Sequence, residues 1–222
     1  MDNVVDALVR IGQVTAEQWG LITMEQAERA GTDTSALASL TRAGVLVAED
    51  DGVLRLAGAP LTPHVEIKAA WIRLEPGTPV WERLANGRAV VSHSSACLLH
   101  GLGDLPAGEI EMFATTGSEG AGVRLHPGPG PGPAQITIVG GLPVTTVTRT
   151  ITDLMHAGLD GDHVGGVVAD AVRRGLVGVG DLAQEVARFA PAYGLPASAS
   201  GHDLISRLLT DAGEQILLPL PG

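Results

Sequence analysis

The sequence predicts an α+β chain in two parts, on the order in which helical and strand-like segments follow one another. Residues 1–75 alternate short helical segments with one hairpin-like pair of apolar runs, whereas residues 88–213 begin with short strand-like segments and end with helical ones. Strands followed by helices favour a mixed α+β domain with a small sheet over a doubly wound one. We therefore expect two domains, 1–75 and 88–213, joined by a linker over 76–87 and followed by a tail over 214–222.

Two helices and a tight turn are predicted near the N-terminus. Thr23 can cap a helix over 24–30, and Thr32-Asp33 offers a fresh cap for a second helix over 34–43. A glycine follows each of these helices directly, as is typical of helix C-termini. The pattern predicts a helix-turn-helix.

A hairpin is predicted directly after these helices. The apolar runs 45–47 and 53–56 flank an acidic tip that ends in Asp51-Gly52, and Asp-Gly between two such runs is a strong short-range hairpin signal. A helix-turn-helix followed by a hairpin predicts a winged helix-turn-helix. The segments 4–11 and 15–21 are expected to supply its first helix.

The remaining elements follow from apolar periodicity and turn residues. Buried or alternating strands are expected over 89–92, 110–114, 122–125, 136–139 and 142–146. Helices are expected over 65–74, 94–99, 148–155, 162–174, 180–189 and 201–212, with a further helical turn over 81–84. Asp160 and Asp181 stand where helix N-caps belong. The alternating Pro-Gly run over 127–133 is expected to be an exposed, extended connection, because proline lacks the N–H that a phosphate loop needs.

Composition limits the function. The chain has 222 residues and a net charge of −11, and residues 1–75 alone hold six basic against eleven acidic side chains. Nucleic-acid binders usually carry a basic patch, so an acidic surface suits a basic protein partner or simple solubility better. Neither a membrane-length apolar run nor a signal pattern is present, so we expect a cytoplasmic protein without a membrane partner. The single cysteine, Cys97, is expected in the core.

Several residues are candidates for catalysis or metal binding. His93 and Ser94 suggest nucleophilic chemistry, but serines beside a histidine are more typical of a helix start. The histidines nearest in sequence, His93 with His100 and His156 with His163, are seven residues apart. This spacing does not match helical zinc sites, so no metal is predicted. Arg149 and Asp153 stand four apart on one helix, which predicts an intrahelical ion pair; alternatively, they fix the sheet or contact a partner. No catalytic residue is assigned.

Three segments resemble one family when they are read together with the winged helix. They are 91–102, 141–154, and 193–194 with 201–204. In order and spacing the chain is similar to the AbiEi family of antitoxins over nearly its whole length. The resemblance implies a winged helix that binds inverted-repeat operator DNA and represses its own operon, and an inverted repeat can be occupied by a dimer. It also implies a C-terminal domain that counteracts a co-encoded, nucleotidyltransferase-like toxin.

The resemblance also implies site residues. DNA-reading positions are expected at Thr34, Ser35, Ser39, Arg42, Arg55 and Lys68. Toxin-binding or structural roles are expected for His93, Ser94, Arg149 and Asp153. This sequence departs from the pattern in charge, because the wing tip is acidic and the second helix offers one arginine. Hydroxyl groups can still bond phosphates or base edges.

Two alternatives remain open at this point. One is an antitoxin that phosphorylates its toxin with ATP and Mg²⁺, for which the candidate groups are Arg149, Arg173, Arg174, Asp153 and Asp170. Nothing in the chain matches a kinase glycine-rich loop, so we expect no enzyme activity and no cofactor outside that alternative. The other is a protein-interaction module whose winged helix has lost DNA binding and whose acidic surface binds a basic toxin.

Overall fold

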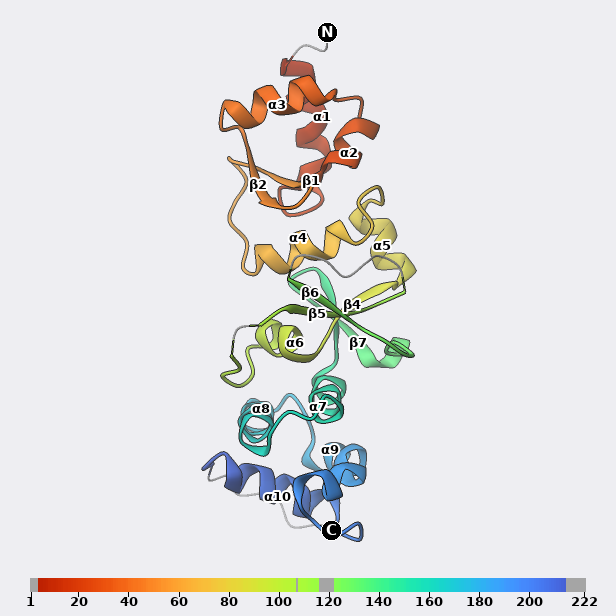
Figure 1. Cartoon of the computed structure of the whole chain (residues 1–222), viewed down its shortest axis with the longest axis vertical. Coiled ribbons are helices and arrows are strands. Elements are labelled where there is room, and N and C mark those ends of the chain that lie inside the picture. The colour runs from red at the N-terminus through yellow and green to blue at the C-terminus, as the bar shows by residue number, and fades with distance from the viewer. Residues whose placement is uncertain (1–3, 107, 116–121, 215–222) are drawn as a thin grey trace. The chain divides into compact units, whose positions relative to one another are not determined.

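The computed structural model describes residues 4–106, 108–115 and 122–214 (Figure 1). Its contacts divide the chain into two compact units. The first unit is Met1–Ala89 with Ala114–Leu125, and the second is Val90–Phe113 with His126–Gly222. Of the expected tail, all residues after Glu214 lie outside the described residues.

The first unit begins as a winged helix-turn-helix. Its elements are α1 (Val4–Ala16), β1 (Leu21–Thr23), α2 (Met24–Arg29), α3 (Thr34–Arg42), β2 (Leu46–Asp50) and β3 (Val53–Leu56). The strands form an antiparallel sheet in the order β1-β3-β2. Apolar residues of α1 and α3, among them Ile11, Leu37 and Leu40, pack together in one core. This confirms the predicted winged fold.

The prediction for one segment of this fold is wrong. Residues 15–21 were expected to be helical, but α1 ends at Ala16 and a third strand begins at Leu21. Trp19 and Gly20 both adopt positive φ, at 58° and 80°, and such angles cannot continue a right-handed helix. The chain therefore turns here and adds β1 to the sheet.

The predicted helix caps are present. Thr23 and Gln26 form a capping box, in which the Thr23 hydroxyl accepts from the Gln26 N–H at 3.0 Å and the Gln26 carbonyl oxygen accepts from the Thr23 N–H at 3.1 Å. Asp33 caps α3 by accepting from the Ala36 N–H at 2.7 Å. These bonds satisfy N–H groups that a helix start leaves unpaired.

Two further helices, α4 (Val65–Arg73) and α5 (Val80–Asn86), complete the helices of the first unit. Arg83 of α5 is buried, and its guanidinium donates to the carbonyls of Trp71 and Ile72. These carbonyls belong to the last turn of α4, where i+4 donors within the helix run out; the Ile72 carbonyl also accepts from the Glu75 N–H at 3.2 Å. Arg83 also lies over the Trp71 ring, with 4.0 Å between the guanidinium carbon and the ring centre. The side chain therefore caps the C-terminus of α4.

A five-stranded sheet follows in the order β6-β5-β4-β8-β7. Its strands are β4 (Ala89–Val91), β5 (Ile110–Ala114), β6 (Val123–His126), β7 (Ile136–Val139) and β8 (Leu142–Thr145). β4 pairs with β8 in parallel, and β7 pairs with β8 antiparallel. All five expected strands are present, and the mixed sheet confirms the α+β class. The short 3-10 helix η1 (Pro133–Gln135) leads into β7 after the exposed Pro-Gly run.

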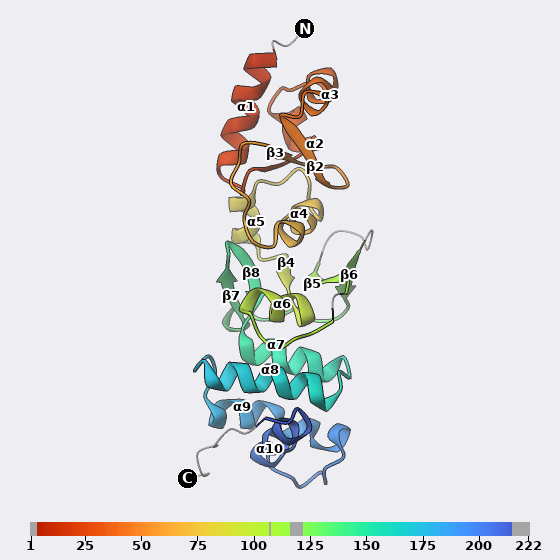
Figure 2. The same cartoon turned by 90° about the vertical axis from the view of Figure 1, so that its left-hand side faces the viewer.

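Helices make up the rest of the second unit. They are α6 (His93–His100), α7 (Val147–His156), α8 (Gly161–Arg173), α9 (Val179–Val186), η2 (Ala187–Tyr193) and α10 (Gly201–Asp211). Figure 2 shows α7 between the sheet with α6 and the helices α8, α9 and α10. The core of these helices includes Cys97, as predicted, and burial raises the pKa of its thiol to about 12.

The two expected caps in this region differ. Asp160 caps α8 by accepting from the His163 N–H at 3.1 Å. Asp181 does not cap α9, because that helix begins after Gly178 and places Asp181 in its first turn. An acidic side chain in a first turn still favours the helix through the dipole. Among the described residues, no helix has both the length and the apolarity needed to cross a bilayer.

Candidate functional site

The exposed face of α3 is the first candidate site. Asp33 starts this helix, and its apolar residues Leu37 and Leu40 are buried in the core. The opposite face carries polar side chains: Thr34, Ser35, Thr41 and Arg42 are exposed, and Ser39 is half-buried. Three of the expected DNA-reading hydroxyls and Arg42 therefore share one solvent-facing helix. We call this set, Thr34, Ser35, Ser39, Thr41 and Arg42, the α3 surface.

Arg42 is the cation of the α3 surface. It lies in the last turn of α3, where a positive charge interacts favourably with the helix dipole. Within the described ranges, no ion pair engages its guanidinium. The group is exposed and available to an anionic ligand.

The acidic wing is largely neutralised by arginines. Glu49 forms an ion pair with Arg55 across the hairpin. Asp50 pairs with Arg73 of α4, with 2.9 Å between the Asp50 oxygen and the Arg73 Nε. Only Asp51 stays exposed at the tip. The wing is therefore far less repulsive to a phosphate backbone than its sequence indicated, and Arg55 is engaged in that compensation.

Lys68, the other expected DNA-binding cation, lies in the core. The residue is 4% exposed and its ammonium is 5.3 Å from the centre of the Trp19 ring. Burial lowers its pKa, with partial opposition from Glu66. The lysine therefore contributes to packing and to a cation–π contact rather than to an exposed surface.

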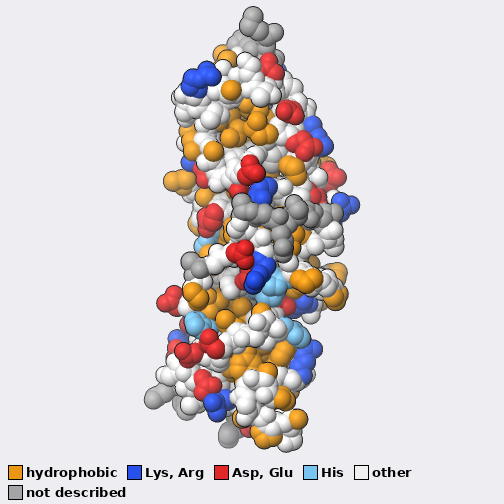
Figure 3. All heavy atoms as spheres, in the orientation of Figure 1, with side chains coloured by type: hydrophobic (Ala, Val, Ile, Leu, Met, Phe, Trp, Pro, Cys, Tyr) orange, Lys and Arg blue, Asp and Glu red, His pale blue; other side chains and the backbone are white. Residues whose placement is uncertain are grey.

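Charged side chains do not gather into a basic area on the face drawn in Figure 3. Acidic and basic groups alternate there, with apolar and neutral groups between them. This matches the net charge of −11. A ligand of the α3 surface is therefore held by few cations.

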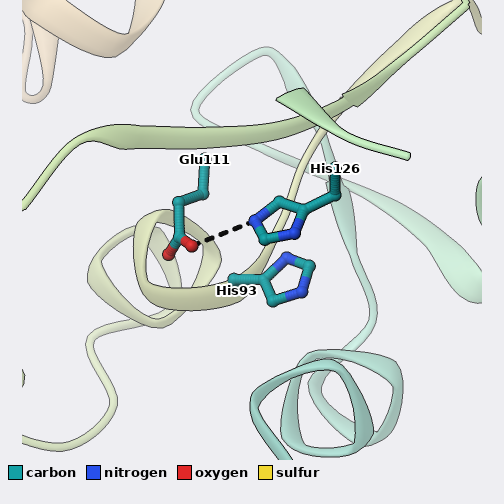
Figure 4. Close-up of side chains that lie close together, drawn as sticks. All are labelled: His93, Glu111 and His126. Carbon is teal, nitrogen blue, oxygen red and sulfur yellow. Dashed lines mark hydrogen bonds and ion pairs between the residues drawn. The ribbon is translucent and has the colours of Figure 1, made fainter. Parts of the chain in front are cut away.

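A polar cluster in the second unit is the second candidate site. His93 opens α6, Glu111 lies in β5 and His126 ends β6 (Figure 4). The rings of His93 and His126 stack with 3.5 Å between their centres and 12° between their planes. Nε2 of His126 is 3.0 Å from Oε1 of Glu111. We call these three residues the His-Glu-His cluster.

Backbone geometry and hydrogen bonds position the cluster. His93 is buried and has a φ of 51°, a left-handed conformation that is costly for a residue other than glycine. Ser92 stands at the N-cap position of α6, but its hydroxyl lies 2.9 Å from Nδ1 of His93 and makes no cap bond. The N–H of Ser94 donates to Oε2 of Glu111 at 2.9 Å. The helix start therefore orients a histidine and a carboxylate at once.

The predicted ion pair between Arg149 and Asp153 adjoins this cluster. Nε of Arg149 donates to Oδ1 of Asp153 at 2.7 Å. The Arg149 guanidinium also lies over Phe113, whose ring centre is 5.5 Å from that of His93. Asp153 is buried, and burial raises its pKa despite the opposing effect of Arg149 and the weaker ones of nearby histidines. Its Oδ2 has no hydrogen-bond partner among the described residues.

The structure thus brings together four residues that the sequence singled out, namely His93, Ser94, Arg149 and Asp153. Sequence reasoning missed Glu111 and His126. Both lie on strands outside the segments that resemble the antitoxin family, and no local spacing connects them to His93. The available sequence signal for these residues was a glutamate in the expected strand 110–114 and a histidine directly after the next expected strand, 122–125.

The other candidates for phosphoryl transfer have structural partners. Asp170 accepts from the Gly103 N–H at 2.8 Å. Arg174 donates to the carbonyls of His100 and Gly101 at the end of α6. Arg173 pairs with Glu214 at 2.6 Å. Asp170 and Arg174 therefore bond to backbone groups, and Arg173 forms a surface ion pair.

The fold and the α3 surface define this chain as a winged helix-turn-helix protein with an α+β C-terminal unit. No family model matches the sequence, and no curated protein matches it. The structure is similar to the crystal structure of the Rv2827c protein from Mycobacterium tuberculosis, with a TM-score of 0.53 and 17% identity. The match covers 95% of this chain and 78% of that one. At this identity the likeness shows a shared fold.

Proposed function

We propose that this chain is a DNA-binding regulator that serves as the antitoxin of a bacterial toxin–antitoxin pair and represses its own operon in the cytoplasm. The observation that carries the DNA-binding part is the α3 surface, with its hydroxyls and its exposed Arg42, which makes no ion pair with the residues that the structure describes. The antitoxin part rests on the second-unit segments that resemble the AbiEi family.

The position of the hydroxyls fits base reading. In helix-turn-helix proteins the N-terminal residues of the second helix contact base edges in the major groove. Thr34 and Ser35 are the first two residues of α3, and both are exposed. Hydroxyl groups can donate to or accept from either base of a pair. Arg42, two turns further along, suits a phosphate or a guanine.

The low positive charge has a measurable consequence. If each monomer neutralises two or three phosphates, the slope of log affinity against log salt is roughly −2 to −3 per monomer, at about −0.9 per contact. Non-specific affinity is then weak. Specific binding depends on two copies that occupy the two halves of an inverted repeat.

The test is a titration of the full chain with the DNA upstream of its own gene, at several salt concentrations, with the toxin present or absent. Arg42→Ala removes one phosphate contact, so affinity falls about tenfold at low salt and the slope shrinks by about 1. Arg207→Ala, an exposed arginine of α10, is the matched control and leaves both unchanged. Unshifted DNA at micromolar protein in both conditions would remove the repressor proposal.

The antitoxin part has its own test. Co-expression of the chain with the neighbouring nucleotidyltransferase-like gene restores growth that the toxin alone arrests.

The net charge of −11 favours one alternative, a protein-interaction module whose acidic surface binds a basic toxin without DNA. Growth rescue without any DNA shift supports that module, and a DNA shift by the chain alone contradicts it.

A further inference from the structure

Three potential metal ligands from distant parts of the sequence converge in the second unit. His93, Glu111 and His126 each offer one ligand atom, and all of these atoms lie within 4.8 Å of one another. In Figure 4 the Glu111 carboxylate meets the edge of the His126 ring, and the His93 ring lies beside it. We infer that the His-Glu-His cluster is a binding site for one divalent transition-metal ion, with Zn²⁺ as the best-matched occupant.

The separation of two ligand atoms already fits a metal. In a tetrahedral zinc site with bonds of about 2.0–2.1 Å, neighbouring ligand atoms lie about 3.3 Å apart. Nε2 of His126 and Oε1 of Glu111 are 3.0 Å apart. An ion that replaces the shared proton therefore requires these atoms to separate by only a few tenths of an ångström. The His93 ring has further to move, because it must leave its stack on His126.

The donor set selects the class of ion. Two imidazoles and one carboxylate suit Zn²⁺ and its neighbours in the first transition row, whereas Mg²⁺ and Ca²⁺ prefer oxygen ligands alone. Three protein ligands leave a fourth position for water, as in zinc sites that are open to a further ligand. Side chains of Glu111 and His126 are 13% and 16% exposed, so an ion can reach them.

The surroundings resemble the outer shell of a metal site. Ligand histidines and carboxylates in such sites are usually held by further hydrogen bonds. Here Ser92 holds His93, and the Ser94 N–H holds the second oxygen of Glu111. The ring of His93 is oriented by Ser92 and by its stack on His126, and its backbone is left-handed, with a φ of 51°. Strained backbone of this kind gathers at ligand sites.

The charge balance also favours a cation. Asp153 is buried beside the cluster, and its partner Arg149 lies over Phe113, whose ring is 5.5 Å from that of His93. Oδ2 of Asp153 lacks a hydrogen-bond partner among the described residues. Arg149 pairs with Oδ1 of Asp153. The cluster and Asp153 therefore contain two carboxylates, those of Glu111 and Asp153, and Arg149 is the one permanent cation beside them. A bound divalent ion adds positive charge where a buried acceptor remains unsatisfied.

The first experiment measures Zn²⁺ and Co²⁺ binding to the tag-free full chain by calorimetry and by the visible absorption of bound Co²⁺. One ion per chain is expected. His126→Gln and Glu111→Gln each remove a ligand, so affinity falls by more than the roughly 10- to 100-fold that loss of an outer-shell partner causes. His202→Gln, on α10, is the matched control and leaves affinity unchanged. Equal affinity in all four proteins overturns the site.

A second measurement uses the unaltered protein, so that it does not depend on the folding of variants. At a free Zn²⁺ concentration 100 times the Kd, the midpoint of thermal unfolding rises by about 5–10 °C. X-ray absorption of the loaded protein shows two imidazole nitrogens and oxygen ligands around zinc. No rise in the midpoint, or a spectrum without two imidazoles, contradicts the proposal. Neither outcome bears on DNA binding by the first unit.

Discussion

The two units offer contrasting examples of how buried polar side chains are satisfied, although Gln18 of the first unit also donates to the Gln26 side chain at 2.6 Å. In the first unit, several buried side chains bond to backbone carbonyls. Gln18 donates to the Leu21 carbonyl at 2.7 Å, Gln26 donates to the Thr78 carbonyl at 3.1 Å, and Arg83 caps α4. Such bonds satisfy backbone groups that helix ends and turns leave unpaired. They stabilise the winged fold, and the exposed polar residues of α3 are not among these bonds.

In the second unit, polar side chains bond to one another. His126 pairs with Glu111, and Arg149 pairs with Asp153. Thr145 and Thr150 share a hydrogen bond at 2.7 Å between their hydroxyls. Networks of this kind cost stability if one member is lost, because the others remain buried and unpaired. The two proposed sites follow this difference, because the α3 surface is exposed and the His-Glu-His cluster is largely buried.

Intrinsic probes can report the two units separately. All three tryptophans, Trp19, Trp71 and Trp81, belong to the first unit. The single cysteine, Cys97, belongs to the second, where it is buried and has a raised pKa. Tryptophan fluorescence therefore follows unfolding of the first unit, and the rate at which a thiol reagent labels Cys97 follows unfolding of the second.

The largest effect is expected at the buried ion pair. Arg149→Leu leaves Asp153 buried without its cation and lowers the free energy of unfolding of the second unit by about 3–5 kcal/mol. Urea titration followed by Cys97 labelling measures it. Arg207→Leu is a matched control, because Arg207 pairs with Asp211 at the same i,i+4 spacing but on an exposed surface. It should cost about 0.5 kcal/mol or less. Equal losses in the two variants would contradict the contrast between buried and exposed pairs.

A smaller loss is expected at the helix cap of the first unit. Arg83→Met keeps the apolar stem but removes the bonds to the last carbonyls of α4, which lowers the free energy of unfolding by about 2–3 kcal/mol. Tryptophan fluorescence during urea titration is the measurement. Arg88→Met, at an exposed position next to β4, provides the control and should have little effect. A fluorescence midpoint unchanged by Arg83→Met is incompatible with the capping role.

The smallest effect is a pH dependence at Asp153. Because burial raises its pKa above 3.8, the folded protein retains a proton that the unfolded chain releases. This carboxyl therefore destabilises the fold as the pH rises from 3.8 through the raised pKa. The stability of the wild-type protein relative to Asp153→Asn should therefore fall as the pH rises above 3.8, until the pH exceeds the raised pKa.

Asp203 provides the control for this titration. Hydrogen bonds from Ser200 lower the pKa of Asp203 below 3.8, so its ionisation changes only at lower pH. Relative stability against Asp203→Asn should stay constant over the same range. A flat difference for Asp153→Asn, measured by Cys97 labelling in urea, argues against a raised pKa.

Much of the fold could be predicted because its signals are local. The hairpin of β2 and β3 follows from an Asp-Gly turn between branched apolar runs, and α8 follows from a cap and a helical period. β1 was missed because three residues carry too little pattern. Its strand character comes from pairing with β3, about 30 residues later in the chain.

The same distinction applies to the candidate sites. The α3 surface could be predicted, because one helix with a buried apolar face must expose its polar face. The His-Glu-His cluster could not, since its members come from one helix start and two strands. Which strands lie side by side depends on the order of the strands in the sheet. The sequence pattern of a single strand does not encode that order.

Caps, turns and apolar periods act within a few residues, so the helices, the hairpin of β2 and β3 and the strands of the five-stranded sheet could be predicted from the sequence, as could the acidic charge. Which charges meet depends on the tertiary structure. Asp50 of the wing pairs with Arg73, 23 residues away, and Lys68 turns inward against Trp19. His126 reaches Glu111 and His93 across two strands. Electrostatic and ligand-binding properties depend on separations of a few ångströms, and these are set by packing between elements that lie far apart in the chain.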